Sequence, residues 1–142
     1  MSAIVGFTGT QKGMTSQQKG SIMDLMRELG PVEVHHGDCI GADEEFNGIS
    51  TSMDIAVVLH PPKKRLKRAY CAGTVIDVRK PREYLLRNKD IVRDSDVLIA
   101  APRQFYEPSG RSKGGTWATV GYARNKGMPI YIVYPDGEVV KE

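Results

Sequence analysis

The chain has 142 residues, of which 20 are Lys or Arg and 17 are Asp or Glu, so its formal net charge at pH 7 is +3. A chain of this length without repeats, low-complexity tracts or linkers is expected to form one domain, residues 1–142, with a core of its own. The charge is too small to indicate a nucleic-acid partner, and no apolar run approaches the length of a membrane span or a signal peptide. We therefore expect a cytoplasmic protein without membrane contact.

The first half of the chain alternates between apolar runs and amphipathic segments. Residues 3–7 form a continuous apolar run, typical of a strand that is covered on both faces. Thr15, with Gln18 three residues later, predicts a capping box for a helix that stops at Gly30 and Pro31. The pattern then predicts a strand at 32–36, a helix at 40–52 and a strand at 55–60 that is closed by Pro61 and Pro62.

The second half continues the alternation. It predicts a short extra strand at 74–78, a helix from Pro81 to about residue 93, a strand at 96–100, a helix at 115–126 and a last strand at 130–134. This order of elements requires parallel pairing with right-handed crossovers. The sequence therefore predicts a three-layer α/β domain in which helices flank a parallel sheet of about five main strands.

Ligands of such sheets bind beyond the carboxyl ends of the strands. The predicted strand ends carry Thr8-Gly9-Thr10, the segment 37–43, His60 and the dipeptide 101–102, which places the candidate ligand residues along one edge. The turn at Thr8-Gly9-Thr10 could hold an anion or a ribose, although it matches neither GxGxxG nor a P-loop and could be an ordinary turn.

Two carboxylates follow the second strand, Asp38 after Gly37 and Asp43 near the first turn of the next helix. Asp38 is a candidate for hydrogen bonds with sugar hydroxyls, and Asp43 for a capping or supporting role. Either residue could instead cap the helix.

The segment 112–119 predicts a phosphate site at the start of a helix. Gly114 and Gly115 permit close backbone approach, Ser112 and Thr116 add hydroxyl donors, and the helix offers its free N–H groups. On the predicted helix of 81–93, Arg87 and Asn88 share a stripe with residues that should pack on the sheet. They could tie down neighbouring loops or point into the cleft toward a phosphate.

Two further segments leave alternatives open. The basic run 63–68 could be a solvated loop, a rim that attracts phosphorylated ligands or, without interleaved aromatic residues, a nucleic-acid patch. In the long connection 101–113, Phe105 or Tyr106 could stack on a base or pin the loop to the body.

These motifs together resemble the SLOG superfamily, a Rossmann-like group that includes the Lonely-Guy phosphoribohydrolases, the DNA-processing protein A domain and sensor domains of defence proteins. The resemblance is carried by residues 6–10, 36–43, 87–88 and 114–116. It implies a single SLOG-like domain that binds a nucleotide-derived ligand. The implied phosphate site is Gly114, Gly115 and Thr116, and the rest of the ligand would lie across residues 8–10 and Asp38.

The Lonely-Guy motif PGGxGTxxE ends in a Glu that supports cleavage of the base from ribose 5'-monophosphate. In this chain Thr119 stands at that position, and a hydroxyl that is unionised at neutral pH cannot supply the carboxylate. Glu107, Glu44 or Glu45 could substitute, but their spacing does not support it. The resemblance thus favours a binding protein over an enzyme.

The leading hypothesis is non-catalytic binding, for sensing or sequestration, of a nucleotide-derived signalling molecule such as an ADP-ribose derivative, as in defence signalling or a phage anti-defence sponge. The alternatives are a nucleoside 5'-monophosphate phosphoribohydrolase of Lonely-Guy type and a nucleic-acid-binding accessory similar to DNA-processing protein A. The resemblance also implies a homo-oligomer, a dimer or tetramer. No cofactor is expected.

The histidines and cysteines of the chain do not indicate a metal site. His35, His36 and His60 lack a convincing metal-ligand spacing with Cys39 and Cys71, so we expect no metal and two reduced thiols.

Overall fold

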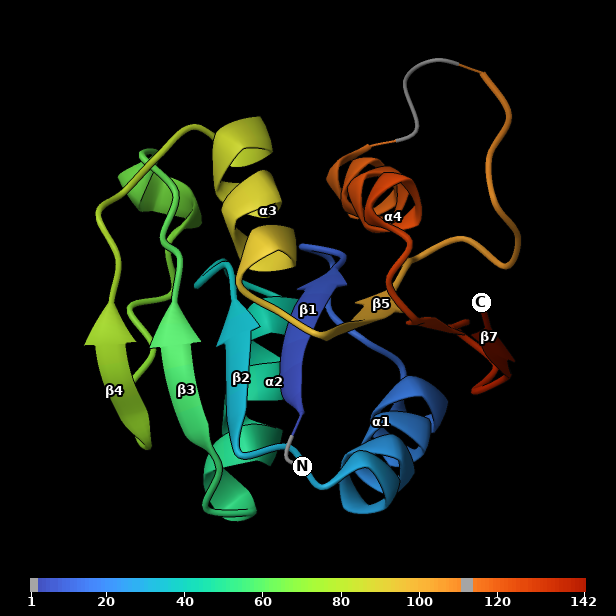
Figure 1. Cartoon of the computed structure of the whole chain (residues 1–142), viewed down its shortest axis with the longest axis horizontal. Coiled ribbons are helices and arrows are strands. Elements are labelled where there is room, and N and C mark those ends of the chain that lie inside the picture. Colours follow the sequence, from blue (N-terminus) through green and yellow to red (C-terminus); the bar gives the residue numbers. More distant parts are fainter. Residues whose placement is uncertain (1–2, 111–113) are drawn as a thin grey trace.

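A seven-stranded sheet with helices on both faces forms the body of the computed structural model, which describes residues 3–110 and 114–142 (Figure 1). The strands are β1 (Ile4–Gly9), β2 (Glu33–His36), β3 (Ala56–Leu59), β4 (Val75–Val78), β5 (Val97–Ala101), β6 (Ile130–Val133) and β7 (Val139–Lys141). The helices are α1 (Ser16–Leu29), α2 (Ala42–Ser52), α3 (Tyr84–Arg93) and α4 (Gly115–Lys126), with a 3-10 turn η1 (Arg65–Lys67). None of the helices in these described ranges has the length and apolarity needed to cross a membrane.

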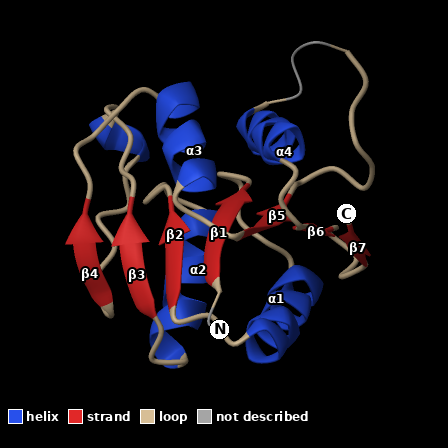
Figure 2. Ribbon diagram, in the orientation of Figure 1, coloured by secondary structure: helices blue, strands red, loops and turns tan. Residues whose placement is uncertain are grey.

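The sheet confirms the predicted Rossmann-like α/β class. Its order is β4-β3-β2-β1-β5-β6-β7, and every pairing is parallel except that of β6 with β7 (Figure 2). The chain moves outward from β1 to β4 and then returns to β5 on the other side of β1. Strand order therefore reverses at β1, which is where ligands bind in open α/β sheets.

The five main strands predicted are confirmed as β1, β2, β3, β5 and β6, and each edge of the sheet carries one further short strand. The short strand expected at 74–78 is confirmed as β4. The strand β7 was missed, because it has three residues that are all exposed and it pairs with a neighbour on one side only. Such a strand carries no alternation of buried and exposed residues from which to predict it.

Two helices begin later than the sequence indicated. The helix predicted from Pro81 begins at Tyr84, since Arg82 forms an isolated parallel bridge with Pro62 instead. The helix predicted from residue 40 begins at Ala42, because the Ile40 N–H donates to the Lys67 carbonyl at 2.9 Å. In both places a contact with a distant segment competes with the first helical turn.

Each face of the sheet has its own core. Val5, Phe7 and Val34 point toward α1 and α2, and the ring of Phe7 stacks on that of Phe46 in α2 with centroids 4.2 Å apart. Leu98 and Ile132, whose side chains point to the other face, pack under α3 and α4. The alternation along each strand thus fixes which helices cover which face.

Gln18 joins α1 to two strands of the sheet. The predicted capping box is confirmed, with the Gln18 N–H donating to Thr15 Oγ1 and the Gln18 side chain accepting from the Thr15 N–H, both at 3.0 Å. In addition, the buried Gln18 Nε2 donates to the carbonyls of Pro102 at 2.8 Å and Val133 at 3.0 Å. One amide therefore satisfies two carbonyls at the ends of β5 and β6.

We expect Gln18→Ala to lower the free energy of unfolding by about 2–4 kcal/mol, because it leaves two buried carbonyls unpaired and removes half of the capping box. Urea unfolding followed by circular dichroism measures this. The matched control is Gln17→Ala, an exposed neighbour on the same helix, which should stay within about 0.5 kcal/mol of the parent chain. Equal effects of the two substitutions would contradict this role of Gln18.

Candidate functional site

A cavity of about 530 Å³ opens at the carboxyl ends of the central strands. Its walls are the turn after β1, the segment after β2, one face of α3, and the start of α4 with the loop before it. Most of the residues predicted to bind ligand lie in this lining: Thr8, Gly9, Thr10, Gly37, Arg87, Asn88, Gly114, Gly115 and Thr116. The fold thus brings together motifs that lie up to a hundred residues apart in the sequence.

Three predicted ligand residues are not part of the lining as the structure describes it. Ser112 lies outside the described residues. Asp38 is fully buried, and its carboxylate accepts from Arg68 Nε and from the Cys71 N–H, both at 2.8 Å. The ring of His60 points toward His35, at 2.7 Å. Asp38 and His60 therefore hold loops in place beside the cavity instead of facing it.

Arg87 is the central polar residue of the site. It is only 5% exposed, and its Nη1 donates to the carbonyls of Gly37 and His60, while Nε donates to Asn88 Oδ1 at 2.8 Å. Both terminal nitrogens also lie 3.7 Å from Cys39 Sγ. The two alternatives for Arg87 are thus compatible, since the side chain ties two strand ends together and also lines the cavity.

Within the described part of the chain, the charge of Arg87 has no directly bonded counterion. Among the described residues, no carboxylate oxygen lies within 4 Å of its guanidinium, so its partners there are neutral. Asp43 is the acidic side chain in the described lining, and its Oδ2 accepts from the Cys39 N–H at 3.2 Å. Burial raises the pKa of Asp43, although the charges of His36 and Arg87 act in the opposite direction. An anion could therefore improve the electrostatic balance around Arg87.

The His36 side chain holds the segment after β2 in place through hydrogen bonds to Asp38 and Asn47. The ring is fully buried, its Nδ1 accepts from the Asp38 N–H at 3.0 Å, and its Nε2 lies 2.9 Å from Asn47 Oδ1. Because Nδ1 is used as an acceptor, the ring is neutral with its proton on Nε2. Burial lowers the pKa of His36 accordingly, despite the nearby Asp43 carboxyl.

The loop that follows β2 packs so closely against its neighbours that glycine is required at positions 37 and 41. A side chain on Gly37 would collide with the Arg87 guanidinium and would come within 2.8 Å of Asp43 Oδ2. Gly41 has a φ of 90°, and a Cβ there would collide with the Gln11 carbonyl. The Ala42 N–H donates to the Thr10 carbonyl at 2.9 Å, which locks the two loops together. The cavity floor is therefore rigid backbone.

The start of α4 forms the opposite wall. Gly114 has a φ of 87°, and no side chain among the described residues caps the helix. Its first internal bond runs from the Ala118 N–H to the Gly114 carbonyl at 3.0 Å. The N–H groups of Gly115, Thr116 and Trp117 precede that bond, so the helix gives them no acceptor. All three residues line the cavity. This is the geometry in which helices bind phosphate or carboxylate groups.

Cationic side chains dominate the entrance of the cavity. Lys12, Lys64, Lys67 and Arg103 are exposed and line it, whereas Asp43 is the acidic residue found in the described part of the lining. A cleft with one sign of charge concentrates ligands of the other sign. The position of Lys64 and Lys67 favours the rim interpretation of the basic run 63–68.

The carboxylates considered as substitutes for a hydrolase Glu lie elsewhere. Glu107 pairs with Arg124 at 2.8 Å, and Glu45 pairs with Lys19 at 2.8 Å and accepts from the Met14 N–H at 2.7 Å. Thr119 is fully buried, and its hydroxyl donates to the Gly115 carbonyl at 2.9 Å within α4. None of these side chains belongs to the described lining of the cavity.

Several lining residues were missed by the sequence analysis. Tyr84 adds aromatic surface, and the Arg87 guanidinium lies over its ring at 5.3 Å from the centroid. Trp117 also belongs to the lining, but it is only 3% exposed and packs in the core under α4. Tyr84 could have been found, because it precedes Arg87 by three residues on the same helical stripe. Cys39 also lines the cavity, and no sequence pattern indicated it. Phe105 and Tyr106, considered for stacking on a base, are 67% and 74% exposed and lie outside the described lining.

Two solved structures share this fold. The molybdenum cofactor binding protein from the phototrophic bacterium Rippkaea orientalis is 19% identical, with a TM-score of 0.69 over 94% of this chain and 77% of that one. The X-ray structure of TM1055, a structural genomics target, is 20% identical, with a TM-score of 0.64 over 92% of this chain and 72% of that one. No family model and no curated protein matches the chain. The likeness shows the fold, and membership of the SLOG superfamily stays a prediction.

We expect Gly37→Ala to lower the free energy of unfolding by about 1–3 kcal/mol, because the added methyl group displaces the buried Arg87 guanidinium from its carbonyl acceptors. Chemical unfolding measures the loss. The control is Gly48→Ala in α2, where an added Cβ meets no atom within 4 Å and helix propensity should raise stability by up to about 1 kcal/mol. A neutral or stabilising effect at Gly37 would contradict the close packing.

We also expect the His36 ring to titrate below its ordinary pKa of 6.5. Because the folded state binds this proton less tightly than the unfolded state, the contribution of His36 to stability is complete above pH 6.5. It is lost as the pH falls, by up to about 1.4 kcal/mol per pH unit. Histidine ring NMR across pH 4–8 measures the midpoint, and a value at or above 6.5 would contradict the lowered pKa of His36.

Proposed function

We propose that the chain binds a phosphate-bearing, nucleotide-derived small molecule in this cavity and releases it unchanged. The observation that carries the proposal is the position of the α4 N-terminus, which no described side chain caps, beside the cations around the cavity. The described lining holds one carboxylate, that of the buried Asp43. Helix N–H groups hold one phosphate group at close range, and the surrounding lysines and arginines attract it from solution.

The cavity also fits the remaining parts of a nucleotide. Its volume of about 530 Å³ lies within the range of small-molecule sites. Tyr84 presents aromatic surface for a base, and Thr8, Thr10 and Asn88 present polar groups for ribose hydroxyls. A bound ligand would thus find apolar and polar contacts in separate parts of one lining.

Binding without cleavage is favoured by the placement of the carboxylates. Cleavage of an N-glycosidic bond needs a carboxylate or a base at the reacting carbon. Thr119 has no carboxyl group and its hydroxyl is used inside α4, whereas Asp43 is buried and accepts a backbone hydrogen bond. The phosphoribohydrolase alternative therefore depends on Asp43, which makes Asp43→Asn its direct test.

The identity of the ligand is proposed from resemblance. SLOG domains of defence systems suggest an ADP-ribose derivative, and a stand-alone domain of this kind would sense such a signal or sequester it. One solved relative is named a molybdenum cofactor binding protein, which adds phosphorylated organic cofactors to the ligands worth testing. We also propose a dimer or tetramer, which light scattering after size-exclusion chromatography would measure.

The test is a thermal-shift panel of AMP, ADP-ribose, cyclic ADP-ribose isomers, NAD and cyclic dinucleotides, followed by chromatography of the incubated ligand. We expect at least one phosphorylated ligand to stabilise the protein and to be recovered intact. Release of free base that disappears in Asp43→Asn would overturn binding without cleavage. Stabilisation by single-stranded DNA alone would favour the nucleic-acid alternative.

Adjacent lysines supply a matched pair of variants. Lys64 lines the cavity, whereas Lys63 is exposed outside its described lining and lies 4.0 Å from Glu83. We expect Lys64→Ala to weaken binding of the stabilising ligand by about three- to tenfold at low salt, because one cation near the phosphate is lost. Lys63→Ala should have little effect. Isothermal titration at two salt concentrations measures both, and equal losses would place the ligand elsewhere.

A further inference from the structure

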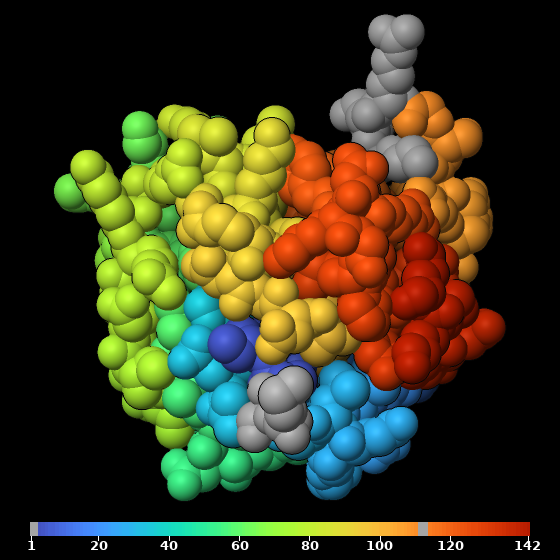
Figure 3. Space-filling view, in the orientation of Figure 1, coloured from blue at the N-terminus to red at the C-terminus, as the bar shows by residue number. Residues whose placement is uncertain are grey.

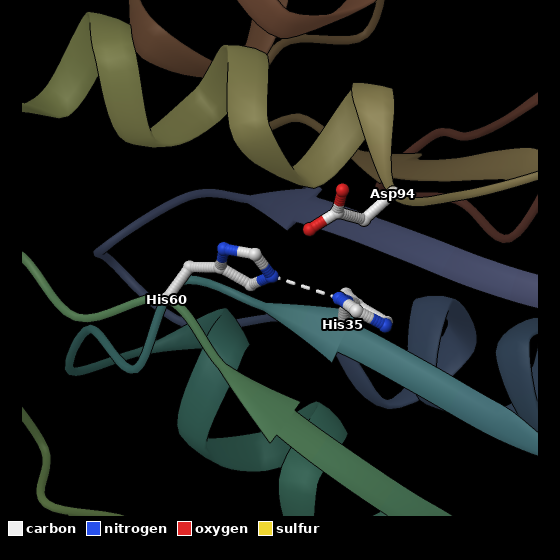
Figure 4. A group of neighbouring side chains, drawn as sticks. All are labelled: His35, His60 and Asp94. Carbon is white, nitrogen blue, oxygen red and sulfur yellow. Dashed lines mark hydrogen bonds between the residues drawn. The ribbon is translucent and has the colours of Figure 1, made fainter. Parts of the chain in front are cut away.

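We propose that His35, His60 and Asp94 form a binding site for one divalent transition-metal ion of the zinc type. The three residues each offer one ligand atom, and these atoms all lie within 4.8 Å of one another. Figure 4 shows the Asp94 carboxylate above the two imidazole rings, with the rings facing each other. The site is separate from the ligand cavity, since none of the three residues belongs to its described lining.

Three elements that are distant in sequence supply the cluster. His35 lies in β2, His60 follows β3, and Asp94 caps the carboxyl end of α3. The two histidines are 1% and 3% exposed, and the Asp94 side chain is 22% exposed. An ion could therefore enter from the Asp94 side and reach two buried nitrogen ligands.

Glu33 fixes the tautomer and the orientation of the His35 ring. Its Oε2 lies 2.6 Å from His35 Nε2, and a carboxylate can only accept, so the proton of the ring is held at Nε2. The lone pair of His35 then lies on Nδ1, which faces His60 Nε2 at 2.7 Å. A carboxylate behind a metal-binding histidine is the usual arrangement in zinc sites, where it fixes the tautomer and orients the ring.

His60 is suited to the same role. The ring is buried, and its Nε2 is the nitrogen that faces His35 Nδ1 at 2.7 Å. In the metal-free state its Nε2 carries the proton that is donated to His35 Nδ1. When the ion binds both facing nitrogens, this proton moves to His60 Nδ1, and no net proton is released.

The geometry requires only a small rearrangement. Tetrahedral zinc with nitrogen ligands at about 2.0–2.1 Å places ligand atoms about 3.4 Å apart. The facing nitrogens would separate from 2.7 Å, and Asp94 would move inward from at most 4.8 Å. Two imidazoles and one carboxylate leave a fourth position open for water, as in zinc sites that keep an exchangeable ligand.

Two arginines compete with the ion for Asp94. Arg93 Nε donates to Asp94 Oδ1 at 3.0 Å, and Arg79 Nη2 lies 3.8 Å from Oδ2. Both guanidinium side chains are well exposed, at 66% and 47%, so each can turn into solvent when the ion binds. The charge of Arg79 also opposes a dication, and its removal should therefore tighten binding.

The test uses the full chain, without a histidine tag, in titrations with Zn²⁺ and Co²⁺ and with no nucleotide present. We expect one equivalent of Zn²⁺ by calorimetry and a tetrahedral visible spectrum of bound Co²⁺ without a thiolate charge-transfer band. Asp94→Asn should weaken binding at least tenfold and His60→Gln at least a hundredfold. Arg79→Gln should strengthen it several-fold.

The control variants separate this site from adventitious binding. Asp24→Asn removes an 82% exposed carboxylate, and Cys71→Ser removes a thiol, so neither should change the affinity. Circular dichroism confirms that each variant is folded, and the partly exposed Asp94 and Arg79 keep the test informative if His60→Gln does not fold. No stoichiometric binding, or binding that Asp94→Asn and Arg79→Gln leave unchanged, would overturn the proposal.

Discussion

The buried guanidinium of Arg87 is the interaction on which the candidate site depends. Through the carbonyls of Gly37 and His60 it joins the ends of β2 and β3 to α3, and through Asn88 its own orientation is fixed. A buried cation is costly unless its hydrogen-bonding capacity is used, so these neutral acceptors are what allow it to remain there. Because its partners are neutral, its positive charge stays available to the cavity that it lines.

Several features of the sequence follow from this one side chain. Position 37 must be glycine because the guanidinium passes over it, and the neighbouring Gly41 must have positive φ so that the loop can meet the turn after β1. Asp43 and His36 lie beneath the same loop, where burial keeps His36 neutral and raises the pKa of Asp43. The start of α4 forms the opposite wall of the cavity. The helices α3 and α4 lie against each other over the sheet (Figure 3).

The sequence predicted what local patterns determine. The Thr15 capping box, the buried strands, the glycines at the start of α4 and the stripe of Arg87 and Asn88 all depend on neighbours within a few residues. The contacts of Asp38 do not depend on near neighbours, since its partners Arg68 and Cys71 lie 30 and 33 residues away in the sequence. The same applies to His60 and to β7, whose positions are set by a neighbouring strand and not by their own sequence.

His60 shows why a strand end cannot be assigned to a ligand site from sequence alone. A residue that follows a strand presents its backbone and its side chain in different directions, and the two can serve different parts of the molecule. The His60 carbonyl accepts from Arg87, while its ring faces His35 in the cluster with Asp94. A ligand that fixes the ring therefore also fixes the carbonyl on which Arg87 is held. The Arg87 hydrogen bond and the histidine pair therefore depend on one backbone position, the residue that follows β3.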